Sequence, residues 1–109
     1  MITNEQMNIA HTILQQLGGR RFVTMTGARN ILALDSGLRF KLPSRNFAKQ
    51  GINLVSITLD PSDTYIIQFE KLTRRGMDYT CKTIATFANV YGDQLPAVFT
   101  GATGLDTYL

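Results

Sequence analysis

The first part of the chain places apolar side chains at helical spacing. One stripe, at positions i, i+1, i+4, i+5 and i+8, is formed by Ile9, Ala10, Ile13, Leu14 and Leu17. Thr3 and Gln6 have the spacing of a capping box, and Gly18 suits the left-handed residue that ends a helix. We therefore expect an amphipathic helix over residues 3–17.

The spacing then changes to that of β-strands. Residues 21–26 are β-branched and aromatic, residues 30–34 form a short apolar run, and residues 38–42 alternate apolar residues with cations. The Asp-Ser-Gly triplet at residues 35–37 is a strong turn signal. We expect three strands here, the last two joined as an antiparallel hairpin.

Strand patterns continue after a polar stretch, residues 44–53, that we expect to be a loop. Residues 54–59 and 64–71 alternate on either side of a proline turn, which predicts a second hairpin. A turn at residues 74–76 then leads to a further strand over residues 77–84.

Helical spacing returns near the C-terminus. The apolar positions there are Tyr91, Leu95, Val98, Phe99 and Ala102. If Asp93 is the N-cap, Pro96 falls in the first turn, where a proline is tolerated. We expect a helix over residues 94–103, ended by Gly104.

These elements predict one α+β domain over residues 1–109. We expect a curved antiparallel sheet of about five to six strands, flanked by an N-terminal and a C-terminal helix. The edges of such a sheet would also permit a homo-oligomer. The residues expected in the core are Ile13, Leu17, Phe22, Phe40, Ile57, Tyr65, Ile67, Phe69 and Phe99. The chain has no apolar run long enough to span a membrane and no signal-peptide pattern, which predicts a cytoplasmic protein.

Charge is distributed unevenly along the chain, whose formal net charge is +3. A single acid, Asp35, lies among the basic residues of the segment 20–49, which are Arg20, Arg21, Arg29, Arg39, Lys41, Arg45 and Lys49. After residue 49, four basic residues are outnumbered by six acidic ones. A basic surface of this kind is typical of a polyanionic partner, and the alternative is a merely solvated basic face. Phe47, in the polar loop, is the aromatic best placed for stacking or an interface.

Residue types that carry catalysis are sparse. Cys81 and His11 are single and far apart in sequence, and we expect Cys81 to be a small packed side chain. Gly18 follows a predicted helix, where it ends the helix rather than cradling a phosphate. Asp60 and Asp63 flank a proline turn and suit an Asx turn. The sequence predicts a protein that is not an enzyme and that binds no cofactor or metal.

Several segments together resemble a known family. They include ILQQLGGRRF at residues 13–22, MTGARN at 25–30 and GLRFKLP at 37–43, with shorter matches at 57–59 and 63–65 and at 98–100 and 103–105. This pattern is similar to that of a family of small uncharacterised proteins encoded by phages and other mobile elements. The resemblance implies residence in the cytoplasm of a bacterial host cell.

The chain departs from that family in two places. Residues 85–87, Ala-Thr-Phe, replace a charged stretch that is frequent in the family, and Gly92 and Pro96 interrupt the final helix. A role carried by that region in the family is therefore not transferred to this chain.

Two functions are compatible with these features. The first is a non-enzymatic module that binds nucleic acid through the basic surface of residues 20–49. The alternative is a protein-binding inhibitor of a host enzyme that defends against phages.

Overall fold

The computed structural model describes residues 4–43 and 49–105. Within them the helices are α1 (Asn4–Leu17), α2 (Arg20–Thr26) and α3 (Leu95–Thr103), with short 3₁₀ turns η2 (Lys49–Gly51) and η3 (Gly92–Gln94). The strands are β1 (Arg29–Leu34), β2 (Gly37–Lys41), β3 (Leu54–Leu59), β4 (Tyr65–Arg75) and β5 (Asp78–Val90).

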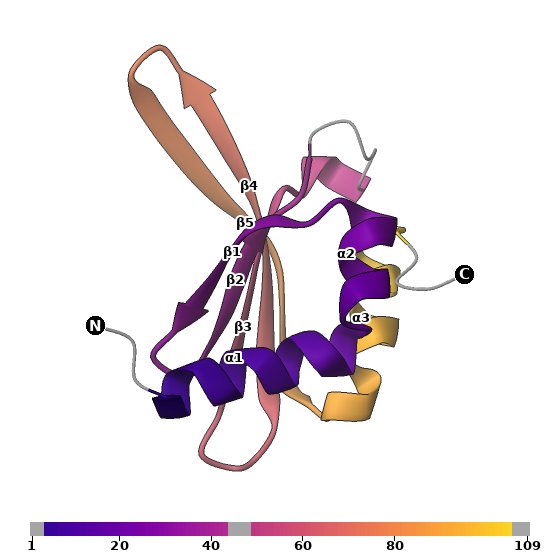
Figure 1. Ribbon diagram of the computed structural model, residues 1–109. Coiled ribbons are helices and arrows are strands. Elements are labelled where there is room, and N and C mark those ends of the chain that lie inside the picture. The colour runs from indigo at the N-terminus through magenta and orange to yellow at the C-terminus, as the bar shows by residue number, and fades with distance from the viewer. Residues whose placement is uncertain (1–3, 44–48, 106–109) are drawn as a thin grey trace.

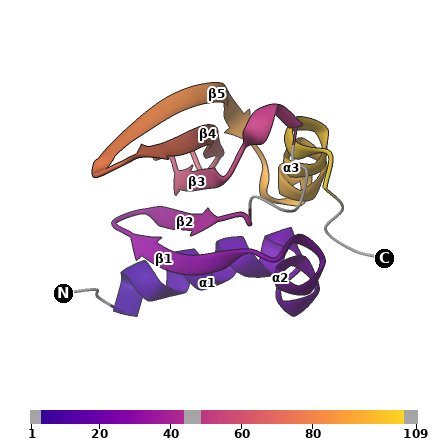
Figure 2. The ribbon, with the colours of Figure 1, turned by 90° about the horizontal axis from the view of Figure 1, so that it is seen from above.

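The strands form one antiparallel sheet in the order β1-β2-β3-β4-β5, so each strand lies beside its neighbour in sequence. Helices α2 and α3 lie on one side of this sheet, and α1 packs against β1 and β2 (Figure 1). The view from above shows the same arrangement, with the end of the β4–β5 hairpin on the side away from α2 and α3 (Figure 2). The predicted α+β fold with an antiparallel sheet is confirmed.

Four phenylalanine rings join the helices to the sheet. The ring of Phe99 on α3 lies 5.1 Å from that of Phe22 on α2, 6.2 Å from that of Phe40 on β2 and 6.3 Å from that of Phe69 on β4. All four side chains are completely buried. Every residue expected in the core is buried, and the burial of Phe40, Ile57 and Ile67 confirms the predicted phases of β2, β3 and β4.

Residues 21–26 form helix α2, so the prediction of a strand there is wrong. Gly19 turns the chain at φ 60°, and the N–H of Gly27 closes the helix by bonding to the carbonyl of Val23. One helical turn places Phe22 and Thr26 on the same side, where both are buried. This burial outweighs the strand preference of the β-branched residues. Gly18 and Gly19 therefore follow helix α1 and precede helix α2.

The ends of several elements also differ from expectation. Strand β4 extends to Arg75 and strand β5 begins at Asp78, so the turn is formed by Gly76 and Met77. Strand β5 then continues to Val90. Gln94, not Asp93, is the N-cap of α3, although Pro96 does fall in its first turn. Thr3, the expected cap of α1, lies outside the described residues. In the described part of the chain, no helix has the length and apolar character needed to cross a membrane.

Candidate functional site

The face of the sheet turned away from the core, here called the open face, carries three cations. Arg39 and Lys41 are exposed on β2, between buried residues that point to the core, as their alternation predicts. The register pairs Arg29 of β1 directly with Lys41. Residues paired across strands extend from the same face, so Arg29, Arg39 and Lys41 share the open face.

A groove of about 690 Å³ crosses the open face. It is lined by Asn30, Ile31, Leu32, Arg39, Lys41, Leu54, Glu70, Leu72 and Cys81. Aliphatic side chains make up much of its wall, and Leu32 is 55% exposed. The groove therefore combines cations with apolar surface, and Glu70 adds one negative charge.

The cations of the open face are poorly neutralised. Arg29 and Lys41 stand directly opposite each other, and neither forms an ion pair with any carboxylate among residues 4–43 and 49–105. Arg39 is oriented by a hydrogen bond from its Nε to Ser56 Oγ, at 3.4 Å. Like charges placed directly across a sheet repel each other, so an anion bound here would relieve that repulsion.

Cys81 is exposed at one end of the groove, which contradicts the prediction that it is packed. It lies opposite Leu72, on a part of β5 that no helix covers. Its Sγ donates a hydrogen bond to Glu70 Oε2 at 2.6 Å. This bond, desolvation and the charge of Glu70 raise the pKa of the thiol, and Arg39 partly offsets them. The thiol is therefore protonated at neutral pH and a weak nucleophile.

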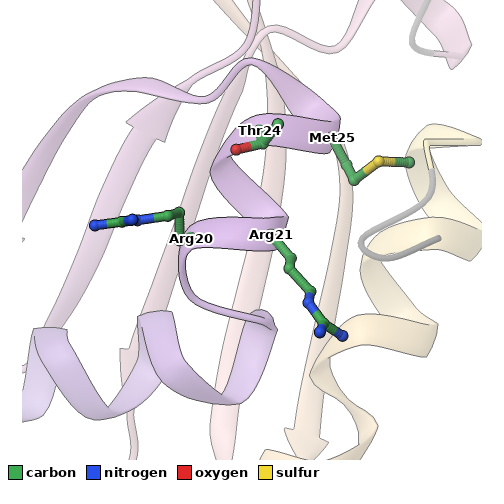
Figure 3. A pocket seen from close by; sticks show the side chains of 4 residues that line it. All are labelled: Arg20, Arg21, Thr24 and Met25. Atoms are coloured by element: carbon green, nitrogen blue, oxygen red, sulfur yellow. The ribbon is translucent and has the colours of Figure 1, made fainter.

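Arg20 and Arg21 lie on α2 rather than at the start of the sheet. A cavity of about 570 Å³ beside this helix is lined by Arg20, Arg21, Thr24 and Met25. Figure 3 shows Arg20 and Thr24 on one side of the helix and Arg21 and Met25 on the other. The two guanidinium groups diverge, and α2 packs on the core face. The predicted continuous surface of residues 20–49 is therefore split into two groups.

The remaining predicted residues contribute little to the groove. Arg45 and Phe47 lie outside the described residues, and Lys49 begins the turn η2. Asp60 accepts hydrogen bonds from the N–H and the hydroxyl of Ser62, at 3.1 and 2.7 Å, which confirms the Asx turn. These bonds lower the pKa of Asp60. The described residues contain no cluster of His, Cys, Asp or Glu that could hold a metal ion.

Sequence reasoning missed a second basic region, the far end of the β4–β5 hairpin. Its cations are Lys71, Arg74, Arg75 and Lys82. The available signal was local charge, since these are all the basic residues that follow residue 49. The net charge of all residues after residue 49 is negative, and this total conceals the local group of cations.

Comparison of the chain with protein-family models, with curated proteins and with solved structures found no match. The candidate site therefore rests on its own geometry.

Proposed function

We propose that the protein is a non-enzymatic module that binds nucleic acid, with phosphate groups held on the open face. The observation that carries this proposal is the cross-strand pair of Arg29 and Lys41 beside Arg39, with no described carboxylate paired to Arg29 or Lys41. Cations of this kind gain free energy from phosphates chiefly by releasing the counterions condensed on the nucleic acid.

The composition of the groove favours contacts to the backbone rather than to bases. Its described lining contains no aromatic side chain on which a base could stack. Phosphate contacts position a protein but carry no sequence information. Binding through the open face is therefore expected to be independent of sequence and strongly dependent on salt.

A protein partner is the second candidate, and the aliphatic part of the groove favours it. Ile31 and Leu32 are exposed on the edge strand β1, next to the cations. A segment of the partner with apolar and acidic side chains would match this surface. If that partner is a host defence enzyme, this protein would inhibit it by binding such a segment. The mobile-element origin, the bacterial cytoplasm and pairing of copies through a sheet edge stay predictions from the sequence.

The test compares two double variants that remove the same charge. Arg39→Ser with Lys41→Ser changes the open face, and Arg20→Ser with Arg21→Ser is the matched control on α2. Fluorescence anisotropy with labelled DNA, single-stranded and duplex, gives the dissociation constant at several salt concentrations. The open-face variant should flatten the logarithmic salt dependence for duplex by about 1.8, the value for two phosphate contacts.

Two outcomes would contradict the proposal. Equal losses in the two variants would mean that net charge, not the open face, determines binding. No binding of the unmodified protein to either DNA at low salt would remove nucleic acid as the partner and favour the protein candidate.

A further inference from the structure

The β4–β5 hairpin continues well beyond the rest of the sheet. Leu54 is the last residue of β3 to pair with β4, and it lies opposite Glu70. Beyond that point five residues of β4 pair only with five residues of β5, from Lys71–Lys82 to Arg75–Asp78. Figure 1 shows this two-stranded arm, residues 71–82, extending away from the body of the domain.

The base of the arm is anchored by one side chain. Asn53 Oδ1 accepts a hydrogen bond from the N–H of Leu72 at 2.7 Å, and Asn53 Nδ2 donates to the carbonyl of Leu72 at 2.9 Å. The side-chain amide thus makes the two hydrogen bonds to Leu72 that the backbone of a further residue in a neighbouring strand would make. Because an isolated two-stranded hairpin is only marginally stable in water, this anchor favours a defined direction for the arm.

The arm is basic. Against Lys71, Arg74, Arg75 and Lys82 it contains one acid, Asp78. All five of these side chains are exposed. The region that follows residue 49, although acidic in total, therefore carries its entire positive charge on this projection.

The cations of the arm lie on both of its faces. Arg74 and Leu72 share the face that continues the open face, together with their partners Tyr79 and Cys81. Lys71, Arg75 and Lys82 lie on the other face, with Lys71 directly opposite Lys82. A ribbon that lies flat on an anionic surface needs cations on one face only. Cations on both faces suit a ribbon placed between two walls of phosphate.

The tip of the arm is apolar and fully accessible. Met77 is 94% exposed. Behind it, the guanidinium of Arg74 lies 5.8 Å from the centre of the Tyr79 ring, and Arg74 Nε donates to the carbonyl of Gly76 at 2.9 Å. In the major groove an apolar side chain can contact base edges such as the thymine methyl group, while cations behind it bind the phosphates on either side.

We propose that the arm enters the major groove of duplex DNA while the open face holds the adjoining phosphates. This inference rests on the proposed nucleic-acid function. The major groove, about 12 Å wide and 8.5 Å deep, admits a two-stranded ribbon in undistorted duplex DNA, whereas the minor groove, about 6 Å wide, is entered by such elements in duplexes that are kinked or bent. Five residues of a strand extend roughly 16 Å, which is enough to reach the floor of the groove. The major groove of duplex RNA is too narrow for side chains to read.

The first experiment measures the affinity for duplex DNA of mixed sequence, the same sequence as duplex RNA, and one of its single strands. Lys71→Gln with Lys82→Gln removes two charges from the arm, and Arg20→Gln with Arg21→Gln is the matched control. Circular dichroism and thermal unfolding verify that each variant is folded. The arm variant should lose on the order of tenfold in affinity for duplex DNA at moderate salt, and the control and the other two nucleic acids should show smaller losses. Equal losses for arm and control, or for all three nucleic acids, would overturn the proposal.

The second experiment identifies the groove and the role of the tip. Methyl green, which occupies the major groove, should displace the protein from duplex DNA, whereas netropsin, which occupies the minor groove, should not. Met77→Asp should weaken duplex binding without changing stability, because the residue touches no part of the core. Displacement by netropsin alone, or full binding by Met77→Asp, would contradict insertion of the arm into the major groove.

Failure of this inference can be distinguished from failure of the proposed function. If Arg39→Ser with Lys41→Ser weakens duplex binding and the arm variants do not, the open face binds DNA and the arm proposal is wrong. If the unmodified protein binds only single strands, the arm proposal is again wrong and the general function stands. If the protein binds no nucleic acid, both are wrong.

Discussion

Strands β4 and β5 run through two regions, the body of the sheet and the arm, which differ in burial and in the number of neighbouring strands. In the body of the sheet, Ile67 and Phe69 of β4 are completely buried beneath the helices. In the arm, the same two strands pair only with each other, most of their side chains are exposed, and Asn53 adds hydrogen bonds to Leu72 at the base. The body therefore supplies the stability of the fold, and the arm can change its surface chemistry without disturbing the core.

The largest expected effect is the loss of a core ring. Phe40→Ala removes contacts with the rings of Phe22 and Phe99 and should lower the free energy of unfolding by about 3–5 kcal/mol. Urea denaturation followed by circular dichroism measures this change. A loss below about 1 kcal/mol would mean that the ring does not hold the two layers together.

A smaller effect is expected where the two regions join. Asn53→Ala removes both hydrogen bonds to Leu72 and should lower the free energy of unfolding by about 1–2 kcal/mol. Amide hydrogen exchange should accelerate in residues 71–82 and remain slow in β3. Gln68→Ala is the control, since it removes only an exposed hydrogen bond to Thr83. Uniform acceleration across the sheet would show that Asn53 supports the whole domain rather than the arm.

The smallest effect concerns the thiol at the boundary of the arm. Because the hydrogen bond and the charge of Glu70 raise the pKa of Cys81, Glu70→Gln should lower that pKa. The thiolate fraction then rises at neutral pH, and alkylation by iodoacetamide should be faster while stability is unchanged. Rates measured against pH give the pKa directly. An unchanged profile would show that Glu70 does not contact the thiol in solution.

The centre of the body could be predicted from sequence because strands β2 and β4 each have one face on the core. The alternation at Leu38, Phe40 and Leu42, and at Tyr65, Ile67 and Phe69, records that contact, and all six residues are buried. Helix α2 could not be predicted in this way. Its β-branched residues favour a strand locally, and only the burial of Phe22 and Thr26 in the assembled core explains the helix.

The site was less predictable than the fold. Arg39 and Lys41 were found because they alternate with core residues, but Arg29 joins them only through the register between β1 and β2, which includes a bulge after Arg29. The arm gave no periodic signal, because a ribbon exposed on both faces places no restriction on which positions are apolar. Its length became evident only from the pairing of Lys71 with Lys82.

The hydrogen bonds of the Asn53 amide have a mechanical consequence, because they set the point about which the arm would bend. Asn53 contacts Leu72 near the base of the arm, and the tip lies roughly 16 Å further on. A rotation of about 10° at the bending point would carry Met77 by about 3 Å, close to the rise of one base pair, ~3.4 Å. If the arm enters the major groove as proposed, small adjustments at Asn53 would let the tip move from one base pair to the next while the sheet keeps its position.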